Sequence, residues 1–333
     1  MAVRIRFGFV AMSRLLQDAS PAHTVTVRSV AGLPAADWRY RLRQAAAANL
    51  ASTLRILRHA AASGIEVYRF SSRLVPLATH PEYGAWPWAD ELAQAFAAVG
   101  AFVREHGMRV SFHPDHFTPL SSPRAEVIGA AHRDWRYHRA MLAAMGLPPL
   151  PLVVHLGGAA GGKAAAMERF CDHVRGLPGS PGGLALENDD RVWTADEVLE
   201  ASSRLSLPVV IDFLHAHVNP GPRPLAEAVR AAAATWPPGL PPKVHLSSAA
   251  SPARPRDHAE YIDPGDARAA LAALAAVGAD SDVMIEAKAK DDALFRLMAD
   301  AAGWPGVEVA GPAALRLAAA AGAAAPPREA PLP

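Results

Sequence analysis

Cysteine is almost absent from this chain, and lysine is scarce. The single cysteine, Cys171, excludes a disulfide framework and fits a reducing compartment. It falls in a stretch that we expect to be helical, so we interpret it as a buried structural thiol. Lysine occurs four times against 29 arginines. The chain therefore uses arginine for general positive charge, and a lysine in its interior needs a specific explanation.

Long apolar runs and excess charge are also missing. No run reaches the ~18 residues that a membrane span requires, and the first residues show no signal-peptide pattern, so we expect a cytoplasmic protein without a membrane partner. The net charge is only +1, so a nucleic-acid partner would have to be held by local arginines and metal ions. The 333 residues are enough for one (β/α)8 barrel of ~250 residues with insertions.

Short apolar runs recur along the chain, and most of them end on a side chain that can bind a metal ion. The runs have four to eight residues, contain β-branched side chains and are bounded by glycine or proline, which is typical of buried parallel strands. Stretches rich in Ala, Leu and Arg separate them, so the pattern is (βα)n. The eight predicted strands are residues 4–11, 66–71, 109–113, 152–156, 184–187, 209–213, 243–246 and 283–287.

We predict a single (β/α)8 TIM barrel over residues 1–317, because eight β/α units follow one another without an internal linker. Residues 318–333 are rich in Ala, Gly and Pro and are expected to form a disordered tail. Thr194 and Asp263 are expected helix caps, since Thr194 precedes Glu197 by three residues and Asp263 precedes a proline. The predicted helices are residues 37–63, 88–106, 123–145, 163–175, 194–205, 224–235, 264–277 and 291–302.

The side chains at the strand ends are the strongest functional signal in the sequence. The carboxyl ends of barrel strands converge on one mouth, where active sites of this architecture lie. Histidine and carboxylates are ligands of Zn²⁺ and Mn²⁺, and a carboxylate can bridge two ions. A single strand-end histidine is more often an ordinary polar residue, but six coincidences of position predict a polynuclear metal site. The six residues are His113, His155, Glu187, Asp212, His245 and Glu286.

Further histidines lie in predicted loops near the same mouth. His215 and His217 follow Asp212 in one βα loop, and His258 follows the seventh strand. His80 lies beyond the second strand. All four are additional candidate ligands.

Lys243 precedes His245 by two residues and therefore points to the same side of its strand. An ammonium group there would repel metal ions. Lys243 could instead stabilise a phosphate, or it could be carbamylated into a bridging anion. A lysine that extends from a strand start to solvent is the alternative interpretation.

Taken together, these motifs resemble the UV damage endonuclease family, which comprises ATP-independent repair nucleases built on a TIM barrel and related to three-metal abasic-site endonucleases. The matching stretches occur in order on all eight predicted strands. Each motif alone is weak, but the ordered set is specific. The stretches are residues 7–12, 49–50, 68–81, 111–114, 154–158, 186–189, 212–215, 243–247 and 284–288.

The resemblance implies a DNA repair endonuclease that makes a metal-dependent single-strand incision immediately 5′ to cyclobutane dimers and 6-4 photoproducts. It implies Mn²⁺ as the cofactor, as two or three ions, with Zn²⁺ or Mg²⁺ as alternatives. Glu187, Lys243 and Glu286 would be catalytic, and Lys243 matches a family lysine that can be carbamylated. The implied metal ligands are His113, His155, Glu187, Asp212, His215, His245, His258 and Glu286.

Loops around the mouth are expected to contact double-stranded DNA that carries UV lesions. The family usually has a lesion-probing Gln-Tyr pair where this chain has His116 and Phe117, a Tyr where it has Phe9, and an Asn where it has Ser13. An aromatic ring at Phe117 can still wedge into a base stack, so these departures affect the range of lesions and not the cutting chemistry. The other expected DNA contacts are His80, Arg14, Arg73 and Arg256, although each arginine could equally be a solvated surface charge.

Two other enzyme classes fit a metal-lined barrel. An abasic-site endonuclease of the same superfamily would act on other lesions. A sugar isomerase or epimerase would use paired ions on a sugar carbonyl and hydroxyl, but such enzymes depend more on carboxylates than on histidines. A non-enzymatic metal-binding module would not need ligands focused on a barrel mouth. The leading expectation is therefore a metal-dependent phosphodiesterase that acts as a monomer in the cytoplasm, at the nucleoid during repair.

Overall fold

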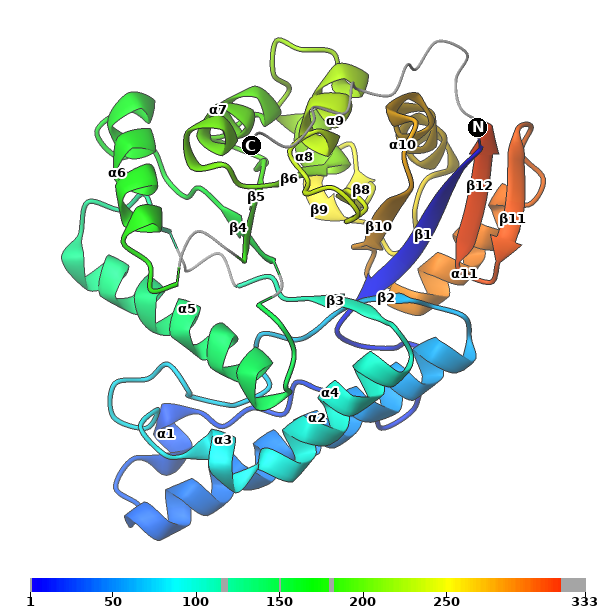
Figure 1. The fold of residues 1–333 in the computed structure, drawn as a ribbon. Coiled ribbons are helices and arrows are strands. Elements are labelled where there is room, and N and C mark those ends of the chain that lie inside the picture. The colour runs from blue at the N-terminus through cyan, green and yellow to red at the C-terminus, as the bar shows by residue number, and fades with distance from the viewer. Residues whose placement is uncertain (1, 115–118, 150, 180–182, 319–333) are drawn as a thin grey trace, which may run out of the picture.

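Eight parallel strands form a barrel that helices surround (Figure 1). A computed structural model describes residues 2–114, 119–149, 151–179 and 183–318. β10 pairs with both β1 and β7, which brings the two ends of the chain of strands together and confirms the predicted TIM barrel. The barrel strands are β1 (Ala2–Val10), β2 (Val67–Arg69), β3 (Arg109–Ser111), β4 (Leu152–His155), β5 (Leu184–Glu187), β6 (Val209–Asp212), β7 (Lys243–Leu246) and β10 (Ser281–Ile285).

The tightest and the loosest contacts between strands both lie near the site. Gly8 of β1 faces Val67 of β2 so closely that a Cβ atom would collide with the Val67 backbone. Between β3 and β4 the pairing is reduced to one bridge, in which Val153 donates to the carbonyl of Phe112 at 3.1 Å. The strand end that carries His113 is therefore held by few backbone hydrogen bonds.

The predicted helices lie close to their expected positions, but one of them is divided, and the short helices Val27–Val30 and Phe213–Val218 were not predicted. α6 and α10 have the predicted bounds, and Thr194 and Asp263 are side-chain caps as expected. The predicted helix 88–106 is instead two helices that meet at Leu92, where ψ is 15°. Among the described residues, no helix combines the length and the apolar character that a membrane crossing needs. The helices are α1 (Val27–Val30), α2 (Ala35–Ala62), α3 (Trp88–Glu91), α4 (Ala93–Glu105), α5 (Ala125–Ala144), α6 (Lys163–Arg175), α7 (Ala195–Leu205), α8 (Phe213–Val218), α9 (Leu225–Ala233), α10 (Pro264–Val277) and α11 (Lys290–Ala301).

Two antiparallel hairpins were not predicted. β8 (Ala249–Ser251) and β9 (Arg254–His258) form one hairpin in the loop after β7. β11 (Val307–Gly311) and β12 (Ala314–Ala318) form the other, in which β12 pairs with the first half of β1 and extends the sheet beside the barrel (Figure 1). Ala318, the first residue of the predicted tail, is thus the last residue of β12, and residues 319–333 lie outside the described part of the chain.

The amino ends of the barrel strands are held by paired charges. Asp282 is fully buried and accepts hydrogen bonds from Arg6 Nε at 2.7 Å, from Arg6 Nη2 at 2.9 Å and from Arg109. Arg6 also contacts Glu66 at 3.2 Å, and the Arg109 guanidinium lies 5.0 Å from the ring centre of Trp236. Each buried charge at this end therefore has an opposite charge beside it.

Candidate metal centre

The carboxyl ends of the strands bring most of the predicted ligands into one cavity of about 150 Å³. Its lining combines histidines and carboxylates from six different barrel strands or the loops that follow them. An arginine from β2, which the sequence did not single out, completes the lining. The lining residues are Arg69, His113, Pro114, His155, Glu187, His215, His258 and Glu286.

Glu187 lies at the centre of this group and is almost fully buried. One carboxylate oxygen, Oε2, lies 2.7 Å from Nε2 of His113 and 3.5 Å from Nε2 of His155. The other oxygen, Oε1, lies 2.6 Å from Nδ1 of His245. Burial disfavours the charged carboxylate, but the three histidines lower the pKa of Glu187 well below its usual value. The carboxylate is therefore ionised and faces a different set of imidazoles with each oxygen.

Three triplets of side chains have the spacing of a metal site, with ligand atoms within 4.8 Å of one another. Two of them share Glu187 and two share His245. Such sharing is the arrangement that lets one residue contribute to neighbouring ions. The triplets are His113–Glu187–His245, His155–Glu187–His215 and Asp212–His245–Glu286.

The histidine tautomers are fixed by backbone carbonyls. Nδ1 of His113 lies 3.0 Å from the Pro114 carbonyl, Nδ1 of His215 lies 3.0 Å from that of Asn188, and Nδ1 of His258 lies 2.8 Å from that of Glu286. A carbonyl can only accept, so Nδ1 carries a hydrogen in each case, and Nε2 is the nitrogen that can bind a metal ion once it carries no proton. Metal-binding histidines have this arrangement, because the second hydrogen bond orients the ring.

Two members of the same cluster, Asp212 and His245, each bury a polar atom that has no hydrogen-bond partner among the described residues. The atoms are Oδ2 of Asp212 and Nε2 of His245. A buried polar atom without a partner is costly and calls for an explanation. Asp212 and His245 belong to one of the triplets above, so their donor atoms, together with the fixed tautomers, fit a site for divalent cations.

The loop after β6 explains how His215 reaches the cavity. Asp212 ends β6 and caps α8, because its Oδ1 accepts from the His215 N–H at 2.7 Å. Asn188 exchanges two hydrogen bonds with the Asp212 backbone, at 2.9 and 3.1 Å, and thereby joins the ends of β5 and β6. His217, on the same short helix, lines a different cavity beside Ser247 and Asp266. The structure thus separates the two histidines of this loop.

Charges around the cluster depend on one another. Burial opposes protonation of His215, but Asp212 and Glu187 raise the pKa of His215 to about 9. Burial likewise opposes ionisation of Glu286, but the ion pair with Arg69 and the nearby His245 lower the pKa of Glu286 far below its usual range. Burial raises the pKa of Asp212, and Glu187 and Glu286 raise it further. The crowded carboxylates therefore favour any added positive charge.

Lys243 lies below the cluster and does not extend to solvent. Its side chain is buried, and Nζ donates to Oγ of Ser111 at 2.9 Å. Ser111 precedes His113 by two residues, as Lys243 precedes His245, so both lie one inward-facing position deeper in the barrel. Burial and the nearby Arg109 lower the pKa of Lys243 well below its usual value. The interpretation as a solvent-exposed lysine is wrong.

Two residues expected to contact DNA make internal contacts, and one of them, Phe9, has no exposed surface. Phe9 is fully buried, and its ring lies 5.4 Å from that of Tyr68 in an edge-to-face contact. Nδ1 of His80 accepts from the N–H groups of Glu82 and Tyr83 at 3.2 and 3.4 Å, which stabilises a turn. Both residues therefore shape the surroundings of the mouth. His116 and Phe117 lie outside the described residues.

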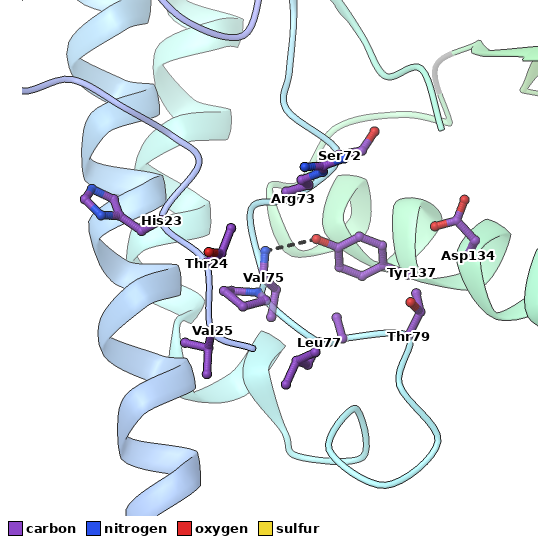
Figure 2. A pocket seen from close by; sticks show the side chains of 12 residues that line it. His23, Thr24, Val25, Ser72, Arg73, Val75, Leu77, Thr79, Asp134 and Tyr137 are labelled. Atoms are coloured by element: carbon purple, nitrogen blue, oxygen red, sulfur yellow. Dashed lines mark hydrogen bonds between the residues drawn. The ribbon is translucent and has the colours of Figure 1, made fainter. Parts of the chain in front are cut away.

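The three arginines expected at the DNA surface occupy different loops. Arg14 is exposed in the loop after β1. Arg256 lies on β9 and donates from Nε to the carbonyl of Asp190 at 3.1 Å. Arg73 lines a second cavity of about 210 Å³, between the segment that begins at His23 and the middle of α5, where Asp134 and Tyr137 lie (Figure 2). In that cavity the hydroxyl of Tyr137 accepts from the backbone of Val75 at 3.0 Å.

This second cavity is joined to the metal centre through backbone contacts. Ser72, which lines it, donates to the carbonyl of His113 at 2.8 Å. Asn49 of α2 is fully buried and binds both loops at its edge: Oδ1 accepts from the His23 N–H at 2.7 Å, and Nδ2 donates to the carbonyls of His23, Arg73 and Leu74 at 3.0, 3.3 and 3.1 Å. The sequence pointed to Asn49 only through the matching stretch 49–50, which did not indicate this role.

The fold and the cluster define a TIM-barrel protein with a candidate polynuclear metal centre at the barrel mouth. Comparison with known proteins identifies the family. The family model "UV-endonuclease UvdE" matches residues 5–318. A UV DNA damage endonuclease of Bacillus velezensis is 39% identical over 307 residues, which cover 91% of this chain and 96% of that protein. The chain therefore belongs to the UvdE family.

A second relative and one solved structure agree with this assignment, and a further solved structure shares the fold alone. A UV DNA damage endonuclease of Halalkalibacterium halodurans is 39% identical over 315 residues, which cover 92% of this chain and 97% of that protein. The crystal structure of SacUVDE superimposes with a TM-score of 0.79 at 27% identity and covers 87% of this chain and 95% of that chain. Endonuclease IV from Thermus thermophilus shares the fold, with a TM-score of 0.51 at 18% identity over 84% of this chain and 91% of that chain.

Proposed function

We propose that this protein is a UV DNA damage endonuclease that cuts one strand of double-stranded DNA immediately 5′ to a cyclobutane dimer or a 6-4 photoproduct. The main support is the cluster around Glu187, in which both carboxylate oxygens face histidines, in a chain that belongs to the UvdE family. The relatives from Bacillus velezensis and Halalkalibacterium halodurans carry the name UV DNA damage endonuclease.

The cofactor would be Mn²⁺, as two or three ions, with Zn²⁺ or Mg²⁺ as alternatives. Bound ions of this kind lower the pKa of water towards ~7 and stabilise the attacking and leaving oxygens of a phosphodiester. Glu187 is suited to bridge two ions, because its two oxygens face different histidines. Arg69 keeps Glu286 ionised as a ligand. The proposed ligands are His113, His155, Glu187, Asp212, His215, His245, His258 and Glu286.

We propose further that Lys243 is carbamylated. Its buried amine favours the neutral form, whose nitrogen lone pair can add to CO₂, so that an N–C bond forms, one proton is released and a carbamate anion remains. This anion would lie one position below His245 and His113. Arginine cannot undergo the same reaction.

A substitution tests this role of Lys243. Lys243→Arg should lose most of the incision activity although arginine keeps the positive charge of an uncarbamylated lysine. The activity of the protein without substitutions should rise when bicarbonate is added after CO₂ has been removed. Lys243→Met controls for the loss of the cation in a buried position. Full activity of the arginine variant, or indifference to bicarbonate, would contradict carbamylation.

Recognition of the lesion would use the loops around the mouth. Arg14, Arg73 and Arg256 would contact phosphates, which position a duplex without reading its sequence. Phe117, with His116, would enter the base stack where a photoproduct has weakened it, since a damaged base costs less to extrude. Phe117→Ala should then weaken incision of a photoproduct duplex while melting temperature and metal content stay unchanged. We propose that the protein acts as a monomer on nucleoid DNA in the cytoplasm.

A plasmid assay tests the function directly. The purified protein should nick UV-irradiated supercoiled plasmid in the presence of Mn²⁺, leave untreated plasmid intact and lose activity in EDTA. A defined duplex with one thymine dimer should be cut at the bond 5′ to the dimer, which sequencing gels resolve. Equal cutting of a duplex with a single abasic site would instead favour an abasic-site endonuclease. If irradiated plasmid is nicked neither with Mn²⁺ nor with Zn²⁺ nor with Mg²⁺, the proposal is refuted.

A further inference from the structure

A group of positively charged side chains lies beside the metal centre on the side of β1 and β10. Arg69 belongs to the cavity lining and is paired with Glu286. Lys290 begins α11, four residues after Glu286, and is half-buried. Arg14 lies in the loop after β1. The proposed ligand set uses none of these three residues directly.

The backbone of Lys290 has a conformation that lysine rarely adopts. Its φ is 57°, in the left-handed region that favours glycine. Backbone strain of this kind persists only where the surrounding structure imposes it, and it is common at functional sites. The conformation turns the chain sharply between the strand end that carries Glu286 and the start of α11.

Asp291, the next residue, holds the β1 loop against this turn. Its side chain is fully buried. Oδ1 accepts from the Arg14 N–H at 2.7 Å, and Oδ2 accepts from the Ser13 hydroxyl and lies 3.1 Å from Nε2 of His59. The carboxylate of Asp291 is therefore saturated by structural contacts. It fixes the backbone of Arg14 beside Lys290.

Within residues 2–114, 119–149, 151–179 and 183–318, the Lys290 ammonium and the Arg14 guanidinium make no hydrogen bond or ion pair. Burial lowers the pKa of Lys290, and Arg69 and Arg14 lower it further, whereas Glu286 and Glu260 act in the opposite direction without forming an ion pair. The half-buried Lys290 ammonium and the exposed Arg14 guanidinium repel each other electrostatically, and an anion bound beside both groups is stabilised by both.

We propose that Lys290 and Arg14 form a binding subsite for a backbone phosphate of DNA, next to Arg69 and Glu286 at the metal centre. The subsite rests on the proposed nuclease function and adds to it a fixed point for the strand. A phosphate held there would place the neighbouring phosphodiester over the cavity. The contact is independent of base sequence and of damage, because it involves only the backbone.

The test measures binding without cutting. Fluorescence anisotropy of a labelled duplex with one thymine dimer is recorded in EDTA over a series of KCl concentrations. Loss of one phosphate contact lowers the slope of log K against log [KCl] by about 0.9. Lys290→Gln and Arg14→Gln should each show this change and bind about three- to tenfold more weakly. An undamaged duplex should show the same loss relative to its own starting affinity.

Two further variants separate charge from structure. Lys288→Gln removes an exposed lysine two residues earlier in the same loop and should leave slope and affinity unchanged. Lys290→Gly removes the charge and relieves the left-handed strain, so the melting temperature should not fall although binding weakens as in Lys290→Gln.

The outcomes distinguish the subsite from the nuclease function. If the unmodified protein nicks irradiated plasmid but Lys290→Gln keeps the original salt slope, the subsite is wrong and the function stands. An equal effect of Lys288→Gln would also overturn it, because the contact would then be general surface charge. Failure of the unmodified protein to nick irradiated plasmid would remove the nuclease function without altering the salt-slope result.

Discussion

The two ends of the barrel both bury carboxylates, but they neutralise them differently. At the amino ends of the strands, Asp282 is held by Arg6 and Arg109. At the carboxyl ends, Glu187 is held by histidines, and Asp212 keeps one oxygen without a hydrogen-bond partner among the described residues. Arginine stays charged at every ordinary pH, whereas histidine changes charge near neutrality. The ion pairs at the amino ends of the strands therefore persist at every ordinary pH. The histidines at the carboxyl ends can exchange protons for metal ions.

The largest effect is expected at the mouth. Glu187→Gln should lower incision by about 10³-fold or more, because the loss of a bridging anion removes several kcal/mol of metal-based stabilisation. The melting temperature should change little, since the amide fills the same space. The measurement is the initial nicking rate on irradiated plasmid, with circular dichroism as the control. Near-normal cutting would mean that Glu187 holds no ion.

The opposite result is expected at the amino ends of the strands. Asp282→Asn leaves Arg109 without a countercharge and Arg6 with Glu66 alone, and breaking a buried pair in this way costs about 3–5 kcal/mol of unfolding free energy. Specific activity of the folded fraction should persist, because the metal ligands are untouched. Glu66→Gln is the matched control: Glu66 is 38% exposed, so its loss should cost less than about 1 kcal/mol. Urea denaturation compares the two, and equal losses would contradict the proposed difference.

The affinity for metal ions should rise with pH, because His215 must lose a proton before it can bind an ion. Its pKa is raised to about 9, and a ligand must be neutral, so Mn²⁺ affinity should rise by about tenfold per pH unit per displaced proton between pH 6.5 and 9 and then level off. Elemental analysis should give two or three ions per chain at pH 9.

The chelated protein gives the control for this dependence. A histidine with a raised pKa contributes stability below its unfolded pKa of about 6.5, and that contribution is lost as the pH rises through 9. The melting temperature of the EDTA-treated protein should therefore fall from pH 6.5 to 9, while that of the metal-loaded protein should not. Affinity that is independent of pH would argue against His215 as a ligand.

A smaller effect is expected for the loops around the mouth. Asn49→Ala leaves buried backbone groups of His23, Arg73 and Leu74 without their hydrogen-bond partner. A buried polar group that loses its partner lowers the unfolding free energy by about 1–3 kcal/mol. The loops should loosen, and the KM for irradiated DNA should rise more than kcat falls. Thr53→Val is the control on the same helix, because the one hydrogen bond of the Thr53 hydroxyl to a described residue goes to the Asn49 carbonyl, at 2.8 Å. A similar rise in KM for both variants would reduce Asn49 to a general packing residue.

The strand-end ligands could be predicted because the signal is local. An apolar run that ends on histidine or a carboxylate specifies both a strand and the position of its last residue, and a parallel barrel places all such ends together. Six such residues at the ends of Val- and Leu-rich runs predicted the mouth before any contact was known. The boundaries of α6 and α10 were equally local, since each has apolar periodicity and a clear end signal.

Other features depended on contacts between distant parts of the chain. β12 pairs with β1 across more than 300 residues of sequence. Its short run of Ala and Leu is by itself typical of a helix or a tail, and the pairing with β1 makes it a strand. Arg69 and Glu286 meet only because β2 and β10 both border β1. No spacing in the sequence joins Asp291 to Ser13 or Asn49 to Arg73.

The sequence by itself determined the barrel, the strand ends that carry the ligands and the family to which the chain belongs, because repeated short-range patterns encode each of them. Only the tertiary structure decided which polar residues are buried and paired. It placed Lys243 beneath the cluster, buried Phe9, separated His217 from His215, and brought the Arg14 backbone beside Lys290 through Asp291. Burial and charge pairing depend on which residues the folded chain brings within a few ångströms of one another. The separation of two residues along the sequence does not predict whether they meet in this way.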